Sequence, residues 1–355
     1  MTTTPEQEAA RCLAAFERAG GRVVDLPILQ PAERLLDLYG EDIRARAYTT
    51  RDPVAGELML RPDFTVPVVD MHLARGAAEA RYAYAGKVFR VQEPGSDRPS
   101  EYDQVGFESF GVADRAAADA EVFGLFSEVL AGLPLRVATG DIGVLIAAIG
   151  GLSTSARRKA ALLRHIWRPG RFRRLLDRFS GRAAMPSHRD SLLAKAAAGE
   201  DILADAGPMI GLRSEAEIWA RVEALAADAR EAPIPAQEAG VIDKILALRA
   251  AAPEALTQLR ALSADLPTLA PAADLFEARL EALGDVSGLM FEGSYGRTNM
   301  EYYDGFVFGF YADAGPEVPP VATGGRYDAL TRAVGRDMPA VGGMIRPALT
   351  AGARG

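Results

Sequence analysis

The sequence LRPDFT at residues 60–65 opens the stretch that decides the fold, and EYDQVGFESFG at residues 101–111 closes it. Between them, residues 82–91 are rich in tyrosine, valine and phenylalanine, which are typical of β-strands. Residues 92–100 contain two prolines, a glycine and an aspartate, a composition typical of a turn. The second half of the stretch therefore predicts two strands joined by a polar turn.

Polar side chains interrupt the apolar pattern of this stretch: Arg61, Asp63, Arg90, Gln104 and Glu108. A guanidinium group can fork onto a carboxylate or a phosphate, and carboxylates beside it can hold an amine. Gln104 and Glu108 stand four residues apart on a predicted strand, so their side chains face the same side. We expect either a site for a small charged ligand or, in the simpler alternative, polar stabilisation of one sheet face.

Bulk composition restricts the class of protein. The chain of 355 residues can bury a substantial core and hold two or three subdomains. Its net charge of −8 argues against a nonspecific grip on nucleic acid, which requires a cationic surface. The single cysteine, Cys12, fits a reducing compartment, and no apolar run approaches the roughly 18 residues of a membrane span. We expect a cytoplasmic protein that binds neither a membrane nor nucleic acid.

The order of predicted elements indicates an α+β fold. Up to residue 150, helices such as 6–19 and 114–131 mix with strands such as 22–29 and 135–139, without a regular βαβ alternation. Residues 187–283 are almost wholly helical in pattern, and strands return after Gly284. We therefore expect one α+β domain from residues 1–150 and 284–355, interrupted by a mainly helical insert at residues 151–283.

The start of this insert is strongly basic. Residues 153–182 contain ten cationic side chains and one acid, Asp177. The simpler interpretation is the solvated face of two helices broken at Pro169-Gly170. The sharper one is a surface for an acidic partner or a phosphate-bearing ligand. The cationic residues are Arg157, Arg158, Lys159, Arg164, Arg168, Arg171, Arg173, Arg174, Arg178 and Arg182.

Familiar catalytic and metal-binding patterns do not occur in the sequence. His72 and His188 lack metal-like partners at ligand spacing. Neither a Ser–His–Asp or Cys–His arrangement nor a phosphate-cradling loop is present. We therefore expect no metal and no cofactor.

Several separated segments together resemble the histidyl-tRNA synthetases. Residues 60–65, 89–90 and 104–108 are similar to the region of that family's second signature. Residues 302–308 resemble its histidine-recognition segment, 324–328 its glycine-rich strand entry, and 27–29 its first, dimer-forming signature. The resemblance covers most of the chain outside residues 151–283. It implies a class II synthetase catalytic core, in which an antiparallel sheet is flanked by helices.

The same resemblance implies a histidine-binding site. Asp63 stands where the synthetases carry a glutamate, and Arg90 could bind a carboxylate or form a structural ion pair. Core packing is an equally good explanation for one of the two tyrosines at 302 and 303. Gly325 and Arg326 are expected to shape the floor of the pocket. The implied histidine-binding residues are Asp63, Thr65, Arg90, Gln104, Glu108, Tyr302 and Tyr303.

The sequence departs from the synthetase pattern where ATP would be held. Gln92 replaces a glutamate, Glu93 and Ser100 replace arginines, and Thr298 replaces the arginine that assists activation. Losing cationic contacts to a triphosphate removes electrostatic stabilisation that adenylate formation needs. Arg346 could keep one such contact. An anticodon-binding domain is not expected.

This combination resembles the regulatory subunits of ATP phosphoribosyltransferase. The resemblance implies a non-catalytic chain that a short-form catalytic subunit requires for the first step of histidine biosynthesis, with histidine as feedback effector and with self-dimerisation through the synthetase-like core. One alternative is a catalytically active, truncated histidyl-tRNA synthetase-like enzyme. The other is an RNA-binding module that uses residues 157–182.

Overall fold

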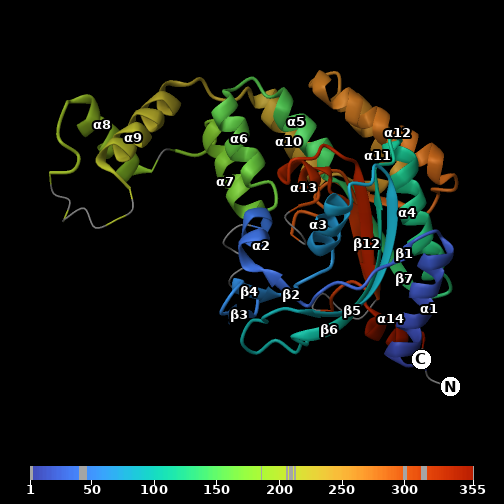
Figure 1. Ribbon diagram of the computed structural model, residues 1–355. Coiled ribbons are helices and arrows are strands. Elements are labelled where there is room, and N and C mark those ends of the chain that lie inside the picture. Colours follow the sequence, from blue (N-terminus) through green and yellow to red (C-terminus); the bar gives the residue numbers. More distant parts are fainter. Residues whose placement is uncertain are drawn as a thin grey trace.

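A nine-stranded sheet forms the centre of the described part of the chain (Figure 1). The computed structural model describes residues 3–39, 46–184, 186–204, 207, 211, 213–298, 302–312 and 318–354. The sheet is antiparallel except for the β1–β5 and β7–β9 pairs. Its strands, in spatial order, are β1 (Arg22–Val23), β5 (Ala80–Phe89), β6 (Glu101–Phe110), β12 (Ala340–Ile345), β11 (Ala322–Arg326), β10 (Phe306–Ala312), β7 (Leu135–Asp141), β9 (Met290–Glu292) and β8 (Arg249–Ala251).

The predicted hairpin is confirmed as β5 and β6. Its register pairs Tyr84 with Gly106 and Gly86 with Gln104. On its other side β6 pairs with β12, which places Gly342 opposite Glu108. The hairpin is thus an internal part of the sheet, and the expected α+β fold is confirmed.

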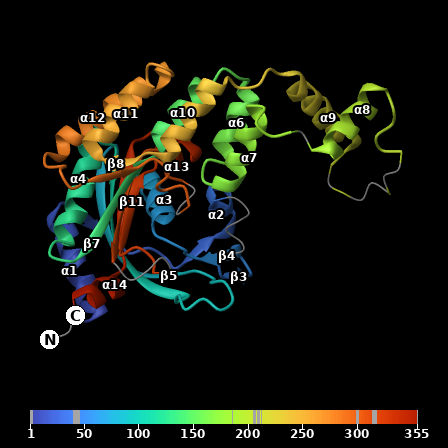
Figure 2. The same cartoon turned by 180° about the vertical axis from the view of Figure 1, so that it is seen from behind.

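Alternation along β6 separates the two faces of the sheet. Val105 and Phe107 pack among helices on one face, in a cluster with Phe16 and Phe126. The helices near this face are α1 (Pro5–Arg18), α4 (Arg115–Val129), α12 (Ala270–Leu283) and α14 (Pro347–Arg354) (Figure 2). The opposite face, toward α3 (Thr65–Arg75) and α13 (Asp328–Ala333), receives the side chains of Gln104 and Glu108.

A second, three-stranded sheet lies beside the main one. Its order is β2 (Leu29–Pro31), β4 (Gly56–Leu60) and β3 (Thr49–Asp52), with α2 (Ala32–Tyr39) next to it. The strand predicted at residues 22–29 is wrong as a single element, because it is divided between β1 and β2. Pro27 stands in the break and has no backbone N–H to give to a ladder. Ile28 and Leu29 are exposed there.

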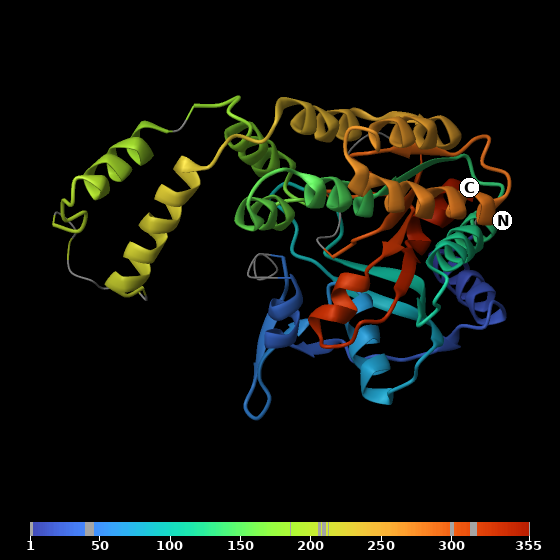
Figure 3. The same ribbon diagram turned by 90° about the horizontal axis from the view of Figure 1, so that it is seen from above.

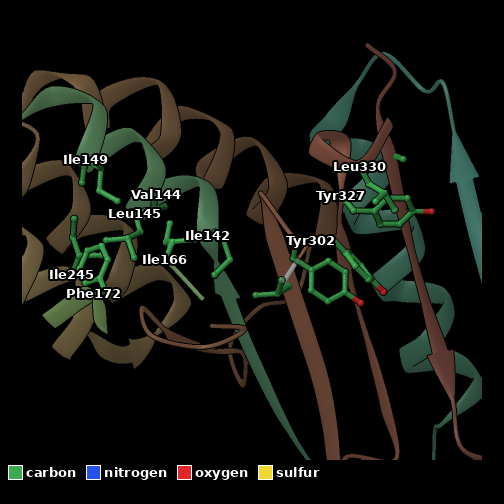
Figure 4. Packing of buried hydrophobic residues seen from close by; sticks show 14 of the residues in the cluster. Ile142, Val144, Leu145, Ile149, Ile166, Phe172, Ile245, Tyr302, Tyr327 and Leu330 are labelled. Atoms are coloured by element: carbon green, nitrogen blue, oxygen red, sulfur yellow. The ribbon is translucent and has the colours of Figure 1, made fainter. Parts of the chain in front are cut away.

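Most of residues 151–283 is helical, as expected. The helices are α6 (Ala156–Arg164), α7 (Pro169–Phe179), α8 (Ser187–Ala197), α9 (Glu215–Arg230), α10 (Ala236–Ala247), α11 (Ala252–Leu262) and α12. Ile166, Phe172 and Ile245 pack against α5 (Ile142–Gly151) in one apolar cluster (Figure 4). By contrast, α8 and α9 project from the body as a pair (Figure 3).

One strand departs from the helical expectation for this segment. β8 supplies the edge of the main sheet, although it lies within residues 187–283, which are predicted to be almost wholly helical. Its Arg-Ala-Ala sequence has helical propensity, and the pairing with β9 overrides it. The division into a core domain and an insert at 151–283 stays a prediction. The main sheet takes its edge strand, β8, from this segment.

Side-chain hydrogen bonds cap the start of two helices. The side chain of Asp114 accepts from the backbone of Ala117 and caps α4. Ser214 and Glu217 form a capping box at the start of α9. Within the described ranges, no helix combines the length and apolar character needed to cross a membrane.

Candidate functional site

A cavity of about 1030 Å³ opens on the sheet face opposite α1 and α4. It is large enough for a ligand of several functional groups, since pockets for small molecules span about 300–1,000 Å³. Its walls come from β6, the start of α3, the segment before β10, and strands β11 and β12. Of the predicted site residues, the structure brings together around it Asp63, Thr65, Arg90, Gln104, Tyr302 and Tyr303.

Gln104 is the most informative side chain in this cavity. It is buried, with 1% of its surface exposed. Within the described part of the chain, neither its amide nitrogen nor its amide oxygen has a hydrogen-bond partner. A buried amide without partners costs about 1–3 kcal/mol. Its position in the cavity wall therefore favours a polar ligand that both donates and accepts hydrogen bonds.

Glu108 lies behind the cavity wall and does not line it. The hydroxyls of Thr65 and Tyr84 donate to Oε1, each at 3.2 Å, and the hydroxyl of Tyr327 donates to Oε2 at 2.5 Å. Gly342 makes room for this carboxyl group, because a Cβ there would lie 1.6 Å from Oε2. Glu108 thus reaches the cavity through the three hydroxyls that surround it.

Burial sets the protonation of Glu108. Removal from water raises its pKa to about 8, against the lowering effect of the hydroxyl hydrogen bonds. Asp63 adds a smaller upward effect, because it is a second acid nearby. At neutral pH and without a ligand, the carboxyl group is mostly protonated, and in this form it donates one of the three hydrogen bonds to a hydroxyl oxygen. A cationic group in the cavity would favour its ionisation.

Thr65 connects the wall of the cavity with this buried carboxyl group. Its hydroxyl donates to Glu108 and accepts from the hydroxyl of Tyr302 at 3.3 Å. The rings of Tyr302 and Tyr303 pack edge to face, with their centroids 4.8 Å apart. Figure 4 shows Tyr302 beside Tyr327 on neighbouring elements. The tyrosines therefore form one side of the cavity as a packed, hydrogen-bonded group.

Cationic side chains line the remaining side of the cavity. Arg90 donates from Nε to the carbonyl of Pro62 at 2.9 Å, which orients its guanidinium group. Arg46, Arg98 and Arg346 also lie in the wall. Burial lowers the pKa of Arg346 to about 10. The cavity thus has an amide- and tyrosine-rich half and an arginine-rich half.

At the position where the synthetase pattern places an arginine before Tyr302, this chain has Thr298. Thr298 lines the wall at that place. The neighbouring Arg297 is buried away from it, donating from Nε to the carbonyl of Ile166 at 2.7 Å and lying 4.7 Å from the ring of Phe172. Burial lowers its pKa to about 10. Arg297 therefore fastens α7 to the body and contributes no charge to the cavity.

The two residues expected to shape the pocket lie on different faces of β11. Gly325 is beneath Tyr303, since a Cβ there would lie 2.9 Å from Cδ1 of that ring. Arg326 points to the helix-covered face, where it pairs with Asp119 at 2.7 Å and with Asp328 at 2.9 Å. Arg326 acts on the site indirectly, by holding the turn that carries Tyr327.

Sequence reasoning missed two residues of the site, Tyr84 and Tyr327. Both contact Glu108, and both line the cavity. Tyr327 belongs to the glycine-rich segment 324–328, and Tyr84 lies on the predicted strand within residues 82–91, so both belong to segments that the sequence had already indicated. Their convergence on one carboxyl group depends on the pairing of β5, β6, β12 and β11.

Among the described residues, no cluster of His, Cys, Asp and Glu could hold a metal ion.

The sheet and its cavity define a class II aminoacyl-tRNA synthetase-like core. The profile of the histidyl-tRNA synthetase family matches residues 3–232 and 219–347. A regulatory subunit/histidyl-tRNA synthetase structure from Bacillus halodurans is 21% identical with a TM-score of 0.68, and covers 98% of this chain and 78% of its own. A histidyl-tRNA synthetase from Nostoc is 16% identical with a TM-score of 0.62, and covers 98% of this chain and 72% of its own. These structures support the fold.

Sequence relatives specify the family further. An ATP phosphoribosyltransferase regulatory subunit from Brucella anthropi is 32% identical, with 93% of this chain and 92% of the relative covered. The protein of the same description from Brucella canis is 31% identical over 88% of this chain and 87% of its own. The chain belongs to this family of histidyl-tRNA synthetase-like ATP phosphoribosyltransferase regulatory subunits, which confirms the resemblance inferred from its sequence.

Proposed function

We propose that this chain binds histidine in the cavity and thereby controls a short-form ATP phosphoribosyltransferase catalytic subunit in the first step of histidine biosynthesis. The complex would work in the cytoplasm, and this chain would carry out no chemistry itself. The observation that carries the proposal is the pairing of an unsatisfied Gln104 amide with the absence of an arginine at Thr298. Such a cavity suits the binding of histidine without its activation to an adenylate.

The chemistry of histidine matches the two halves of the cavity. Its α-amino group would lie near Asp63 and the hydroxyl of Thr65, and its imidazole would exchange hydrogen bonds with the tyrosine side. The guanidinium group of Arg90 would pair with the carboxylate, as arginine does at planar anionic groups. Glu108 would respond from behind through Thr65, since its carboxyl group is not in the wall.

Assembly and inhibition supply the direct test. Adding the chain to a purified short-form catalytic subunit should activate phosphoribosyl transfer to ATP, and histidine should reverse the activation. This reversal requires different histidine affinities in the active and inhibited states. A catalytic subunit that stays equally active with and without the chain would refute the proposal. Histidine-dependent exchange of pyrophosphate into ATP would instead identify an active synthetase-like enzyme.

Replacing Gln104 with leucine should weaken histidine binding to the complex by about 5- to 150-fold, because losing the hydrogen bonds of a buried amide costs about 1–3 kcal/mol. Isothermal calorimetry on the isolated chain and on the complex measures the effect. Gln258→Leu, at an exposed position of α11 outside the cavity lining, is the matched control and should bind histidine like the wild type. Equal histidine affinity in wild type and Gln104→Leu would remove Gln104 from the site.

The small sheet is our proposed surface for self-association. Ile28 and Leu29 are 43% and 46% exposed at its edge, next to the break at Pro27. Apolar side chains at an unpaired strand edge favour contact with another chain. Sedimentation equilibrium should therefore find a dimer, and a monomer at micromolar concentration would argue against this surface.

A further inference from the structure

The end of α6, the following turn and the start of α7 form a concentrated positive surface. We call Arg164, Arg171 and Arg174 the basic corner. Arg164, Arg171 and Arg174 are exposed. Arg171 and Arg174 are three residues apart on α7 and lie on one side of the helix. The corner therefore presents several guanidinium groups in one direction.

Other arginines of the same segment are neutralised within the molecule. Arg158 pairs with Asp228 at 2.7 Å, and Arg182 with Asp243 at 2.5 Å. Arg173 also pairs with Asp243. Within the described ranges, Arg164, Arg171 and Arg174 have no carboxylate at ion-pair distance. The segment thus divides into arginines that hold helices together and arginines left for solvent or a partner.

The titration of His165 reflects the excess of positive charge. Burial lowers its pKa first, and the charges of Arg168, Arg171 and Arg164 lower it further. The groups that shift it are all cationic, with no acid among them. His165 is therefore neutral at physiological pH and adds no charge. An anionic partner at the corner would relieve the repulsion among the arginines.

The basic corner is attached directly to the wall of the cavity. In the turn, Trp167 donates from Nε1 to the carbonyl of Tyr303 at 3.2 Å. The carbonyl of Ile166 accepts from Arg297, one residue before Thr298. Thus both ends of the segment that carries Thr298 and Tyr303 are hydrogen-bonded to residues of this turn. A shift of that segment when the cavity fills would move the corner.

We propose that the basic corner is the docking surface for an acidic patch of the catalytic subunit. This inference rests on the proposed function and assigns its partner a place on this chain. The chain carries a net charge of −8, so an acidic partner would be repelled by much of its surface and steered to the corner. A nucleic acid would meet the same positive surface, so the test below includes RNA binding as an outcome.

The hydrogen bonds of Trp167 and Ile166 would then link docking to effector binding. Histidine contacts at Tyr303 would bias the position of the turn, and the turn would bias the contact with the partner. Because the linkage is reciprocal, docking of the catalytic subunit would also change histidine affinity.

The test is the affinity of the full chain for its cognate short-form catalytic subunit, measured by biolayer interferometry at several salt concentrations. Arg171→Glu/Arg174→Glu should weaken binding about tenfold or more at low salt and flatten the salt dependence, because reversed charges repel an acidic surface. Lys195→Glu/Arg221→Glu is the matched control. It makes the same change in net charge on exposed positions of α8 and α9. It should bind like the wild type.

Each outcome separates this inference from the function it rests on. Equal binding by the Arg171/Arg174 variant and the wild type would overturn the docking surface and leave the regulatory function intact. An equal loss in the control would show a general charge effect and would also overturn it. Loss of binding to a short RNA duplex, with unchanged binding to the catalytic subunit, would assign the corner to nucleic acid. If the wild type does not bind the catalytic subunit, the proposed function itself fails.

Discussion

Replacing Asp119 with alanine should lower the free energy of unfolding by about 3–5 kcal/mol, because it removes one partner from a buried ion-pair network. The Asp119 carboxylate is completely buried between two guanidinium groups. Arg279 lies 2.9 Å from Oδ2, and Arg326 lies 2.7 Å from Oδ1. The variant would leave the Nε donors of Arg279 and Arg326 without their acceptor in the buried layer between α4, α12 and the sheet, although Asp141 and Asp328 would still pair with the two guanidinium groups. Urea denaturation followed by circular dichroism measures the change.

Asp114→Ala supplies a control on the same helix. It removes the cap that Asp114 gives to the backbone of Ala117 and should cost about 1 kcal/mol. Similar losses in the two variants would contradict a special role for the network. The network also joins separate elements, since Arg279 comes from α12, pairs with Asp141 at 2.9 Å and shares Asp119 with Arg326. Its loss should therefore reduce cooperativity between the sheet and the segment 151–283.

The second large effect is a dependence of stability on pH that comes from Glu108. Its pKa is about 8 in the folded chain, against a normal value of 4.5. The folded state therefore binds more protons than the unfolded state between these two values, and stability falls as the pH rises through that window. The contribution of this group is on the order of 5 kcal/mol, since each pKa unit corresponds to about 1.4 kcal/mol.

Glu108→Gln should abolish this part of the pH dependence, because the amide stays neutral in the same buried space. The variant should be more stable than the wild type at pH 8 to 9, with little difference near pH 4.5. Thermal denaturation across that range measures it. Glu128→Gln, at an exposed position of α4, is the control and should follow the wild-type profile. A wild-type profile for Glu108→Gln as well would mean that Glu108 is ionised at neutral pH.

The same ionisation should affect ligand binding. A cationic amine in the cavity stabilises the carboxylate form of Glu108, so the binding of histidine should release a fraction of a proton near pH 7. This coupling also explains a buried acid that contacts three hydroxyls and no cation among the described residues. The neutral carboxyl group behind the wall can ionise when a cationic ligand enters the cavity, and Thr65 connects the carboxyl group to the wall.

The hairpin and most helices could be predicted because their signals are local. Alternating β-formers at residues 82–91, a turn rich in proline and glycine, and caps at Asp114 and Ser214 each act within a few residues. Strands such as β12 also confirm the prediction that strands return after Gly284. The failures at residues 22–29 and at β8 have a common cause. Short strands exist only through their partners, so their own sequence carries a weak signal.

Sequence alone determined which residues could form the site: the order of its segments along the chain indicated the family and nominated Asp63, Gln104, Glu108, Tyr302 and Tyr303. The role of each toward histidine stays a proposal. Only the tertiary structure decided how deeply each side chain is buried and in which direction it points. Strand alternation gives two faces, but pairing between distant strands decides which face becomes the cavity. Long-range packing therefore placed Glu108 behind the hydroxyls of Tyr84 and Tyr327, and turned Arg297 away from the cavity toward Phe172.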